Sequence, residues 1–260
     1  MCLYGKNLYG EKMNDYILEV CVDSVESALA ATEGGATRLE LCSALIVGGV
    51  TPSACLFEAV RGATRLPVRV LIRPRFGDFC YSVHEFEIIR NEVALYRKLG
   101  ADGVVIGCLQ PDGALDTPRL RILKETAGAL PITLHRAFDM CRNPFETLEQ
   151  AERLGIDTVL TSGQKQNCTQ GSALLADLNK RFGSDITIMA GGGVSADGIR
   201  KLYETTGITA FHLSGKTTVK SAMTYRNPAV RMGLESISEY GILLTDMRRI
   251  RAAADVLRGL

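Results

Sequence analysis

The 260-residue sequence lacks three features that would place it in a common class of binding or membrane protein. It has no long basic run, and its 30 lysines and arginines nearly balance 29 acidic residues, for a formal net charge of +1. Such a balance does not favour binding to nucleic acid or to an anionic membrane. No apolar stretch approaches the roughly 20 residues of a membrane-spanning helix, and the first 14 residues lack the apolar core of a signal peptide. We therefore expect a cytoplasmic protein without nucleic-acid or membrane partners.

The cysteines lack a recognisable pattern. There are eight of them, but no two are spaced as a CxxC pair and none fit the spacing of a zinc finger. In a reducing cytoplasm we expect free thiols, unless a metal or a reaction requires them.

What the sequence does contain is a repeated phrase. Four segments start with a glycine that can end a helix, continue through a short turn and enter an apolar strand. With four further β-rich strands between them, the pattern is typical of a (β/α)8 TIM barrel, and 46% hydrophobic content suits one packed domain. We predict this α/β fold as a single domain over residues 16–260, after a flexible N-terminal extension over residues 1–15. The glycine-led segments are 35–41, 100–106, 155–161 and 207–213, and the other strands begin near residues 17, 67, 131 and 186.

Successive side chains of a strand point to opposite faces. In each predicted strand, every second residue is almost always apolar, and these side chains should pack against the outer helices. The residues between them must then face the barrel interior. We expect their polar side chains to gather at the carboxyl-terminal mouth, where barrel enzymes have their active sites. Arg136 falls in the outward set and is expected to reach over the rim. The predicted mouth residues are Glu19, Glu40, Arg73, His135 and His212, with Cys21, Cys42 and Asp139 near the strand ends.

This group predicts acid–base chemistry. Adjacent carboxylates repel each other, so either Glu19 or Glu40 can have a raised pKa and serve as a general acid or base, unless Arg73 keeps both ionised. The alternative is a buried ion-pair network that only fills the barrel. Charged groups that converge on one barrel mouth favour a functional site. The predicted catalytic residues are Glu19, Glu40, Arg73, His135, Asp139 and His212.

Two loops at the same mouth have the composition of an anion site. They follow the seventh and eighth predicted strands, where barrel enzymes often bind phosphate through backbone N–H groups and a helix N-terminus. A run of glycines also suits a plain tight turn. A long aromatic-rich loop over residues 73–82 either covers a ligand or packs as a connection. The predicted anion-binding residues are Gly191, Gly192, Gly193, Ser214 and Gly215.

Cys21 and Cys42 occupy matching positions on neighbouring predicted strands. Two thiols on one face can hold Cu(I), a soft ion that prefers thiolate ligands. The alternative is that both are small buried hydrophobic residues, the commonest role of a free cysteine. A zinc or manganese ion held by Glu19, Glu40 and the two predicted histidines is a further alternative, which repulsion from Arg73 disfavours.

Seven short motifs follow one another within a segment of similarity that runs roughly over residues 17–226: ELC at 40–42, GGVTPS at 48–53, IRPR at 72–75, GDFCYS at 77–82, HRAFD at 135–139, LTSGQ at 160–164 and MAGGGV at 189–194. Together they resemble the CutC family of copper homeostasis proteins. The resemblance implies a TIM barrel, a cytoplasmic location and a homo-oligomer, either a dimer or a tetramer. It also implies copper tolerance and Cu(I) binding, which in this sequence would be centred on Cys21 and Cys42.

Two functions therefore remain open. One is a copper-handling protein that binds Cu(I) through Cys21 and Cys42. The other is an enzyme that uses glutamate and histidine acid–base chemistry on a small anionic or sugar-like metabolite, with Arg73 and the glycine loop holding the anion. The expected ligand is accordingly a copper ion or a small molecule.

Overall fold

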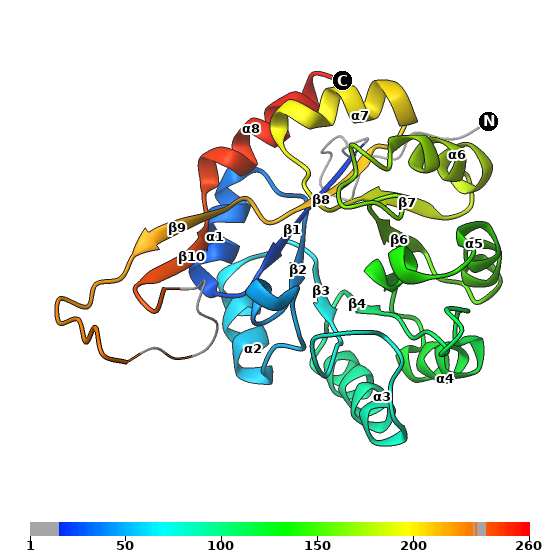
Figure 1. Cartoon of the computed structure of the whole chain (residues 1–260), viewed down its shortest axis with the longest axis horizontal. Coiled ribbons are helices and arrows are strands. Elements are labelled where there is room, and N and C mark those ends of the chain that lie inside the picture. Colours follow the sequence, from blue (N-terminus) through cyan, green and yellow to red (C-terminus); the bar gives the residue numbers. More distant parts are fainter. Residues whose placement is uncertain (1–15, 231, 233–237) are drawn as a thin grey trace.

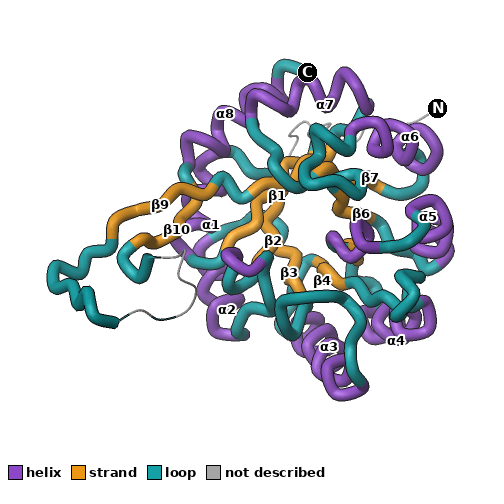
Figure 2. The backbone as a smooth tube through the Cα atoms, in the orientation of Figure 1, coloured by secondary structure: helices purple, strands orange, loops and turns teal. Residues whose placement is uncertain are grey.

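The structure, a computed structural model, describes residues 16–230, 232 and 238–260. Eight parallel strands pair in chain order and close into a barrel, with β1 bonded to both β2 and β8. Helices surround this barrel (Figures 1 and 2). The predicted (β/α)8 TIM barrel is thus confirmed as a single domain. The strands are β1 (Ile17–Val22), β2 (Arg38–Leu41), β3 (Val68–Leu71), β4 (Gly103–Ile106), β5 (Ile132–Leu134), β6 (Thr158–Thr161), β7 (Thr187–Ala190) and β8 (Ala210–Leu213).

The glycines that open the four repeated segments end helices, as the sequence predicts. Gly35, Gly100, Gly155 and Gly207 have φ angles of 95°, 82°, 69° and 68°, a conformation that residues with a side chain rarely adopt. Each turn then leads into the next strand. The helices are α1 (Val25–Gly34), α2 (Ala54–Ala63), α3 (Val83–Lys98), α4 (Thr117–Ala127), α5 (Pro144–Arg153), α6 (Ser172–Phe182), α7 (Ala196–Thr206) and α8 (Met247–Arg258), with the 3-10 helices η1 (Leu45–Val47) and η2 (Arg136–Met140).

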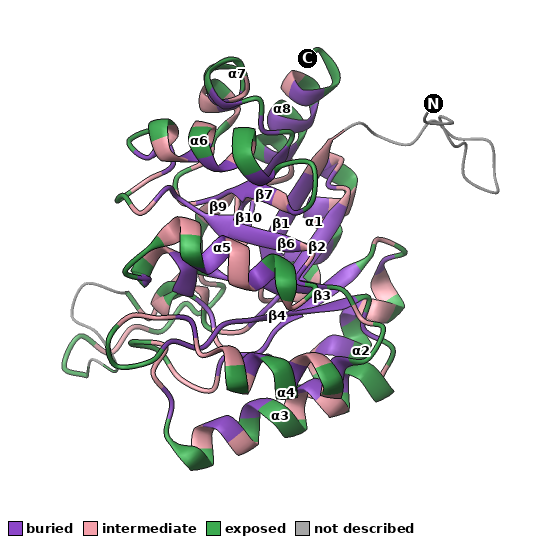
Figure 3. Ribbon diagram, turned by 90° about the vertical axis from the view of Figure 1, so that its right-hand side faces the viewer, coloured by how far each residue is buried: buried purple, intermediate pink, exposed green. Residues whose placement is uncertain are grey.

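The two faces of the strands separate apolar packing from polar chemistry. The outward side chains, such as Leu18, Val70 and Ile188, belong to one large core between the barrel and the helices. Figure 3 shows the strands buried and the helices exposed on their outer sides. Inside the barrel, the buried Arg69 donates to Thr133 Oγ1 (2.6 Å) and pairs with Asp157 (2.8 Å). The predicted inward and outward sets are confirmed for the eight strands.

One predicted strand is shorter than expected. β5 ends at Leu134, and η2 follows it directly, with the Nδ1 atom of His135 accepting a hydrogen bond from the Ala137 N–H (3.1 Å). Strand alternation therefore stops at His135. The predicted inward orientation of Asp139 is wrong, because that residue lies on a helix and not on a strand.

A two-stranded hairpin between β8 and α8 was not predicted. It consists of β9 (Lys216–Lys220) and β10 (Gly241–Thr245), which pair antiparallel, and it extends away from the barrel in Figure 1. No helix within the described residues has the length and apolar character that a membrane crossing requires. The predicted flexible extension, residues 1–15, lies outside the described residues, and the predicted homo-oligomer stays a prediction.

Candidate functional site

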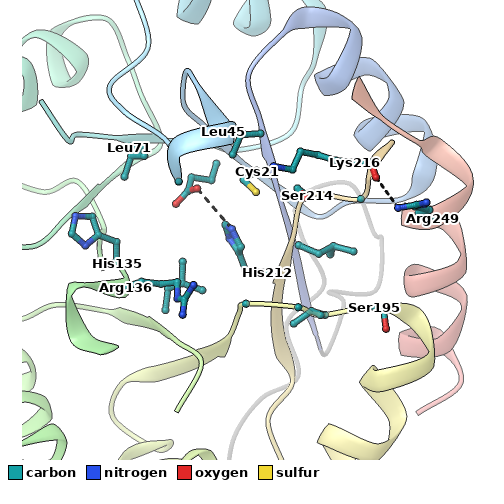
Figure 4. Close-up of a pocket in the computed structure, with 18 of the residues that line it drawn as sticks. Cys21, Leu45, Leu71, His135, Arg136, Ser195, His212, Ser214, Lys216 and Arg249 are labelled. Atoms are coloured by element: carbon teal, nitrogen blue, oxygen red, sulfur yellow. Dashed lines mark hydrogen bonds and ion pairs between the residues drawn. The ribbon is translucent and has the colours of Figure 1, made fainter. Parts of the chain in front are cut away.

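A cavity of about 980 Å³ opens at the carboxyl-terminal mouth of the barrel, where the sequence predicts the site. Its walls come from β1, β2, β3 and β8, from the loops that follow β3, β5, β7 and β8, and from α8. Figure 4 shows His135 and Arg136 on one side, Cys21 and His212 at the centre, and Lys216 on the other side. These residues mark three parts of the cavity: a centre around Cys21 and His212, a wall that carries His135, and a third part beside Lys216.

At the centre, a buried carboxylate orients a histidine. The strand register places Glu19 on β1 beside His212 on β8. Glu19 accepts hydrogen bonds from Arg38 Nε (2.6 Å) and His212 Nδ1 (2.8 Å) and has no exposed surface. Burial alone raises the pKa of Glu19, but Arg38 and then His212 outweigh burial and hold the pKa at about 2. The cation that keeps Glu19 ionised is thus Arg38, and not the predicted Arg73.

Cys21, Glu40 and His212 converge beside this pair. The register of β1 and β2 places Cys21 next to Glu40. One ligand atom from each of the three side chains lies within 4.8 Å of the others, and His212 Nε2 is 3.8 Å from Glu40 Oε2 (Figure 4). Because Nδ1 of His212 already donates to Glu19, its Nε2 atom is the one available to a ligand.

The protonation of this group is set by burial and by neighbouring charges. Burial raises the pKa of Glu40 to about 7, helped by the Glu19 charge and opposed by His212 and Arg38. Burial by itself lowers the pKa of His212, but the electrostatic interactions with Cys21 and Glu40 and the hydrogen bonds to Cys21 and Glu19 raise it well above its ordinary value. A thiol, a carboxyl group and an imidazole in contact can bind a metal ion or move a proton.

Cys42 lies apart from this group. It is fully buried in an apolar cluster with Leu71 and Val105, and its thiol donates weakly to the Val22 carbonyl (3.5 Å). Burial raises the pKa of the Cys42 thiol far above its usual range. Of the two predicted copper ligands, Cys21 lines the cavity and Cys42 is packed beneath it in the thiol form.

Asp139, a predicted catalytic residue, holds a loop instead of lining the cavity. Its carboxylate accepts hydrogen bonds from Thr161 Oγ1 and from the N–H groups of Ser162 and Gln164, at 2.6 to 3.2 Å. It also pairs with Arg136 Nε at 2.7 Å. Arg136 lines the cavity, which agrees with the prediction that it reaches over the rim.

Arg73 and His135 line the opposite wall. Arg73 donates to the carbonyl oxygens of Gly49 (3.1 Å) and Gly77 (2.7 Å). The His135 ring packs against Phe79, with 4.8 Å between ring centroids. The predicted mouth residues therefore form two groups. The set that converges is Cys21, Glu40 and His212, which differs from the disfavoured zinc or manganese alternative of Glu19, Glu40 and both histidines.

The loop after β7 turns sharply at the third part of the cavity. A Cβ atom on Gly191 would lie 2.4 Å from Leu160 Cδ1, so this glycine permits close packing and does not line the cavity. Ser195 precedes α7 without a capping side-chain hydrogen bond, so its hydroxyl satisfies none of the N–H groups in the first turn of the helix. The other predicted anion-binding residues line the cavity: Gly192, Gly193, Ser214 and Gly215.

Two arginines of the site were not expected from the sequence. Arg38 shares the inward face of β2 with Glu40, so strand alternation could have identified it. Arg249 lines the cavity from α8, where no strand pattern indicates it, and donates to the carbonyl oxygen of Lys216 (2.6 Å). Lys216 follows Ser214 and Gly215 in the predicted anion loop and also lines the cavity.

Known proteins resemble this chain over most of its length. A family model described as the CutC family matches residues 16–217. A CutC protein of Bacteroides fragilis is 45% identical over 92% of this chain and 96% of its own. The copper homeostasis protein cutC homolog of Homo sapiens is 41% identical over 95% of this chain and 91% of its own.

Solved structures also align with this chain. The structure of a copper homeostasis protein CutC from Streptococcus agalactiae aligns with a TM-score of 0.73 and 28% identity, over 76% of this chain and 98% of that one. Thiamine phosphate pyrophosphorylase from Pyrococcus furiosus aligns with a TM-score of 0.58 and 21% identity, over 95% of this chain and 97% of that one, which shows a shared fold alone. On the family model and the identity to these relatives, the chain belongs to the CutC family.

Proposed function

We propose that this protein binds Cu(I) in the cytoplasm and buffers or transfers it, with the Cys21 thiolate and the His212 imidazole as ligands and Glu40 beside them. The observation that carries this proposal is the convergence of the three side chains within 4.8 Å. The relatives named for copper homeostasis add support for copper as the ion.

The chemistry of the donors suits the proposal. Thiolate is the preferred ligand of Cu(I), and imidazole also binds copper well. The hydrogen bond from His212 Nδ1 to Glu19 fixes the ring and directs Nε2 towards Cys21 and Glu40. Both ligands bind metal only after losing a proton, so the affinity for Cu(I) should weaken as the pH falls.

Cys42 is the second thiol in the sequence-based hypothesis. To bind copper it must become a thiolate within an apolar cluster, against the effect of burial on its pKa. We therefore propose Cys21 as the principal thiolate, with Cys42 contributing less.

An anaerobic Cu(I) titration against a coloured chelator tests this proposal. We expect one equivalent to bind. Cys21→Ser should lower the affinity for Cu(I) by more than about a hundredfold, because removing a metal ligand costs more than removing a residue that only hydrogen-bonds to a ligand, which itself costs up to about a hundredfold. Cys55→Ser, at an exposed cysteine on α2, is the matched control and should bind as the wild type does.

Two results would change the assignment. Equal losses in Cys21→Ser and Cys42→Ser would make the two cysteines the ligand pair. Weak binding that neither substitution alters would reject copper binding at this mouth.

A second function is favoured by a different observation. Glu40, with a pKa of about 7, lines the same cavity as Lys216, Arg249 and the glycine loop. A carboxyl group poised near neutral pH suits general acid–base catalysis on a small anionic or sugar-like metabolite. In a screen of phosphorylated and sugar-like compounds, Glu40→Gln should lower kcat by about a hundredfold or more, while Cys21→Ala should spare turnover. Turnover that Glu40→Gln leaves intact would reject this role for Glu40.

A further inference from the structure

Arg73 is a buried cation without a carboxylate partner among the described residues. The residue is 8% exposed. Its guanidinium donates to the backbone carbonyl oxygens of Gly48, Gly49 and Gly77 and interacts with the Tyr81 side chain, and its Nε atom has no partner of its own. The other two arginines that point into the barrel are neutralised, Arg38 by Glu19 and Arg69 by Asp157. A buried charge is unfavourable unless an opposite charge or hydrogen bonds compensate it. Arg73 therefore lacks a counter-ion in a cavity that is large enough to admit one.

His135 presents a second unpaired donor on the same wall. Its Nδ1 atom accepts the Ala137 N–H, so the proton of the neutral ring is on Nε2, which has no partner. Burial, and then the charge of Arg73, lower the pKa of His135 to about 3. The ring is thus a neutral N–H donor at ordinary pH and not a general acid that holds a positive charge.

Phe79 joins the two donors into one surface. Its ring centroid lies 4.8 Å from that of His135 and 5.0 Å from the Arg73 guanidinium carbon. With Leu71, these three side chains line the cavity. The wall is therefore apolar apart from one positive charge and two unpaired N–H groups.

We propose that this wall is a subsite for the carboxylate of a small organic acid, whose oxygens accept the free N–H groups of Arg73 and His135. A carboxylate brings one negative charge, which neutralises Arg73, and its oxygens are acceptors only, which matches two donors. A phosphate dianion would leave an excess negative charge against Phe79 and Leu71. The subsite deepens the second function proposed above by naming the substrate class, and it does not depend on copper.

Ring-nitrogen NMR of the metal-free, full-length protein tests the subsite directly. The described residues hold three histidines, of which His84 is exposed on α3 and serves as an internal control. Sodium acetate, sodium pyruvate and inorganic phosphate are titrated at constant ionic strength, with sodium chloride as the blank. We expect acetate and pyruvate to shift the His135 Nε2 signal saturably and to leave His84 unchanged.

Matched variants then assign the donors. Arg73→Met and His135→Phe should each weaken acetate binding by about tenfold or more, the effect of losing one hydrogen bond to a charged group. His135→Gln keeps an N–H donor and should recover part of that loss. Arg90→Met, which removes a guanidinium paired with Glu87 on the surface of α3, should bind as the wild type does.

The outcomes separate the subsite from turnover. Absence of a saturable His135 shift in the wild type with both carboxylates would overturn the subsite even if the variants failed to fold. A shift with phosphate alone would overturn the choice of carboxylate. Saturable acetate binding without any turnover would support the carboxylate subsite and reject the proposed enzymatic function. Turnover of a compound that has no carboxyl group, with no acetate binding, would support the enzymatic function and reject the subsite.

Discussion

Glu19 and Glu40 show how neighbours decide the chemistry of a residue. Both are buried glutamates on adjacent strands, but Glu19 has a guanidinium and an imidazole in hydrogen-bond contact, whereas Glu40 has His212 Nε2 at 3.8 Å. The pKa of Glu19 is accordingly about 2 and that of Glu40 about 7. One carboxylate is a fixed charge that orients His212, and the other can exchange a proton near neutral pH.

At the residue scale, His135 should make the protein sensitive to acid. Its pKa is about 3 in the folded state and near 6.5 when unfolded, so the unfolded state binds about one more proton between those values. The free energy of unfolding should therefore fall as the pH is lowered through that window, by roughly 1.4 kcal/mol per pH unit from this residue.

His135→Gln removes the titrating ring and should flatten this dependence. Urea unfolding of the wild type and the variant at pH 7, 5 and 4 measures it, and His84→Gln is the exposed control. Parallel pH profiles for the wild type and His135→Gln would show that His135 is not held neutral in the fold.

At the element scale, η2 connects the site to the barrel. It follows β5, and its Asp139 binds the end of β6 and the loop beyond it through Thr161, Ser162 and Gln164. His135 is the N-cap of this helix, and Arg136 is its first residue and lines the cavity at the rim. This short helix thus positions two cavity side chains, while the carboxylate of Asp139 binds the loop after β6.

Asp139→Asn should therefore lower stability without changing the chemistry at the cavity centre. The amide cannot accept all of these hydrogen bonds or pair with Arg136, so the free energy of unfolding should fall by at least about 2 kcal/mol. Glu149→Gln, which removes a surface ion pair with Arg181, should change it by less than about 1 kcal/mol. Urea unfolding gives both values, and a loss of Cu(I) affinity in a folded Asp139→Asn protein would show that Asp139 also acts on the copper site.

At the scale of the whole molecule, barrel closure assembles the central group. Cys21 lies on the first strand and His212 on the last, and β1 is the strand that joins β2 to β8. Glu19 and Cys21 therefore meet their partners on both neighbouring strands only when the barrel is closed.

Cu(I) should for this reason stabilise the folded chain. Binding to the folded state alone adds about 2.7 kcal/mol to the free energy of unfolding when free ligand is a hundred times the Kd. Anaerobic urea unfolding with and without buffered Cu(I) measures this gain, which Cys21→Ser should lose. An equal gain in Cys21→Ser would mean that copper stabilises the protein from another site.

Much of the molecule follows from local pattern. Glycine-led helix ends and strand alternation predict the eight strands and their faces, and they place Glu40, Arg73, His135 and His212 correctly around one mouth. The same alternation also predicts that Arg38 faces the barrel interior, because it lies two residues before Glu40 on the same strand. It fails at Asp139, because η2 interrupts the strand pattern, and it carries no information about Arg249, which lies on α8.

The sequence by itself determines which side chains enter the barrel, because the two-residue period of a strand is a local property of the backbone. Only the tertiary structure decides how those side chains pair. The register of β1 with β2 and β8 joins Glu19 to Arg38 and His212, and within the described part of the chain Arg73 is left without a carboxylate. Register and barrel closure depend on contacts between residues up to 193 positions apart. Such contacts decide protonation, because burial and the nearest charge set each pKa.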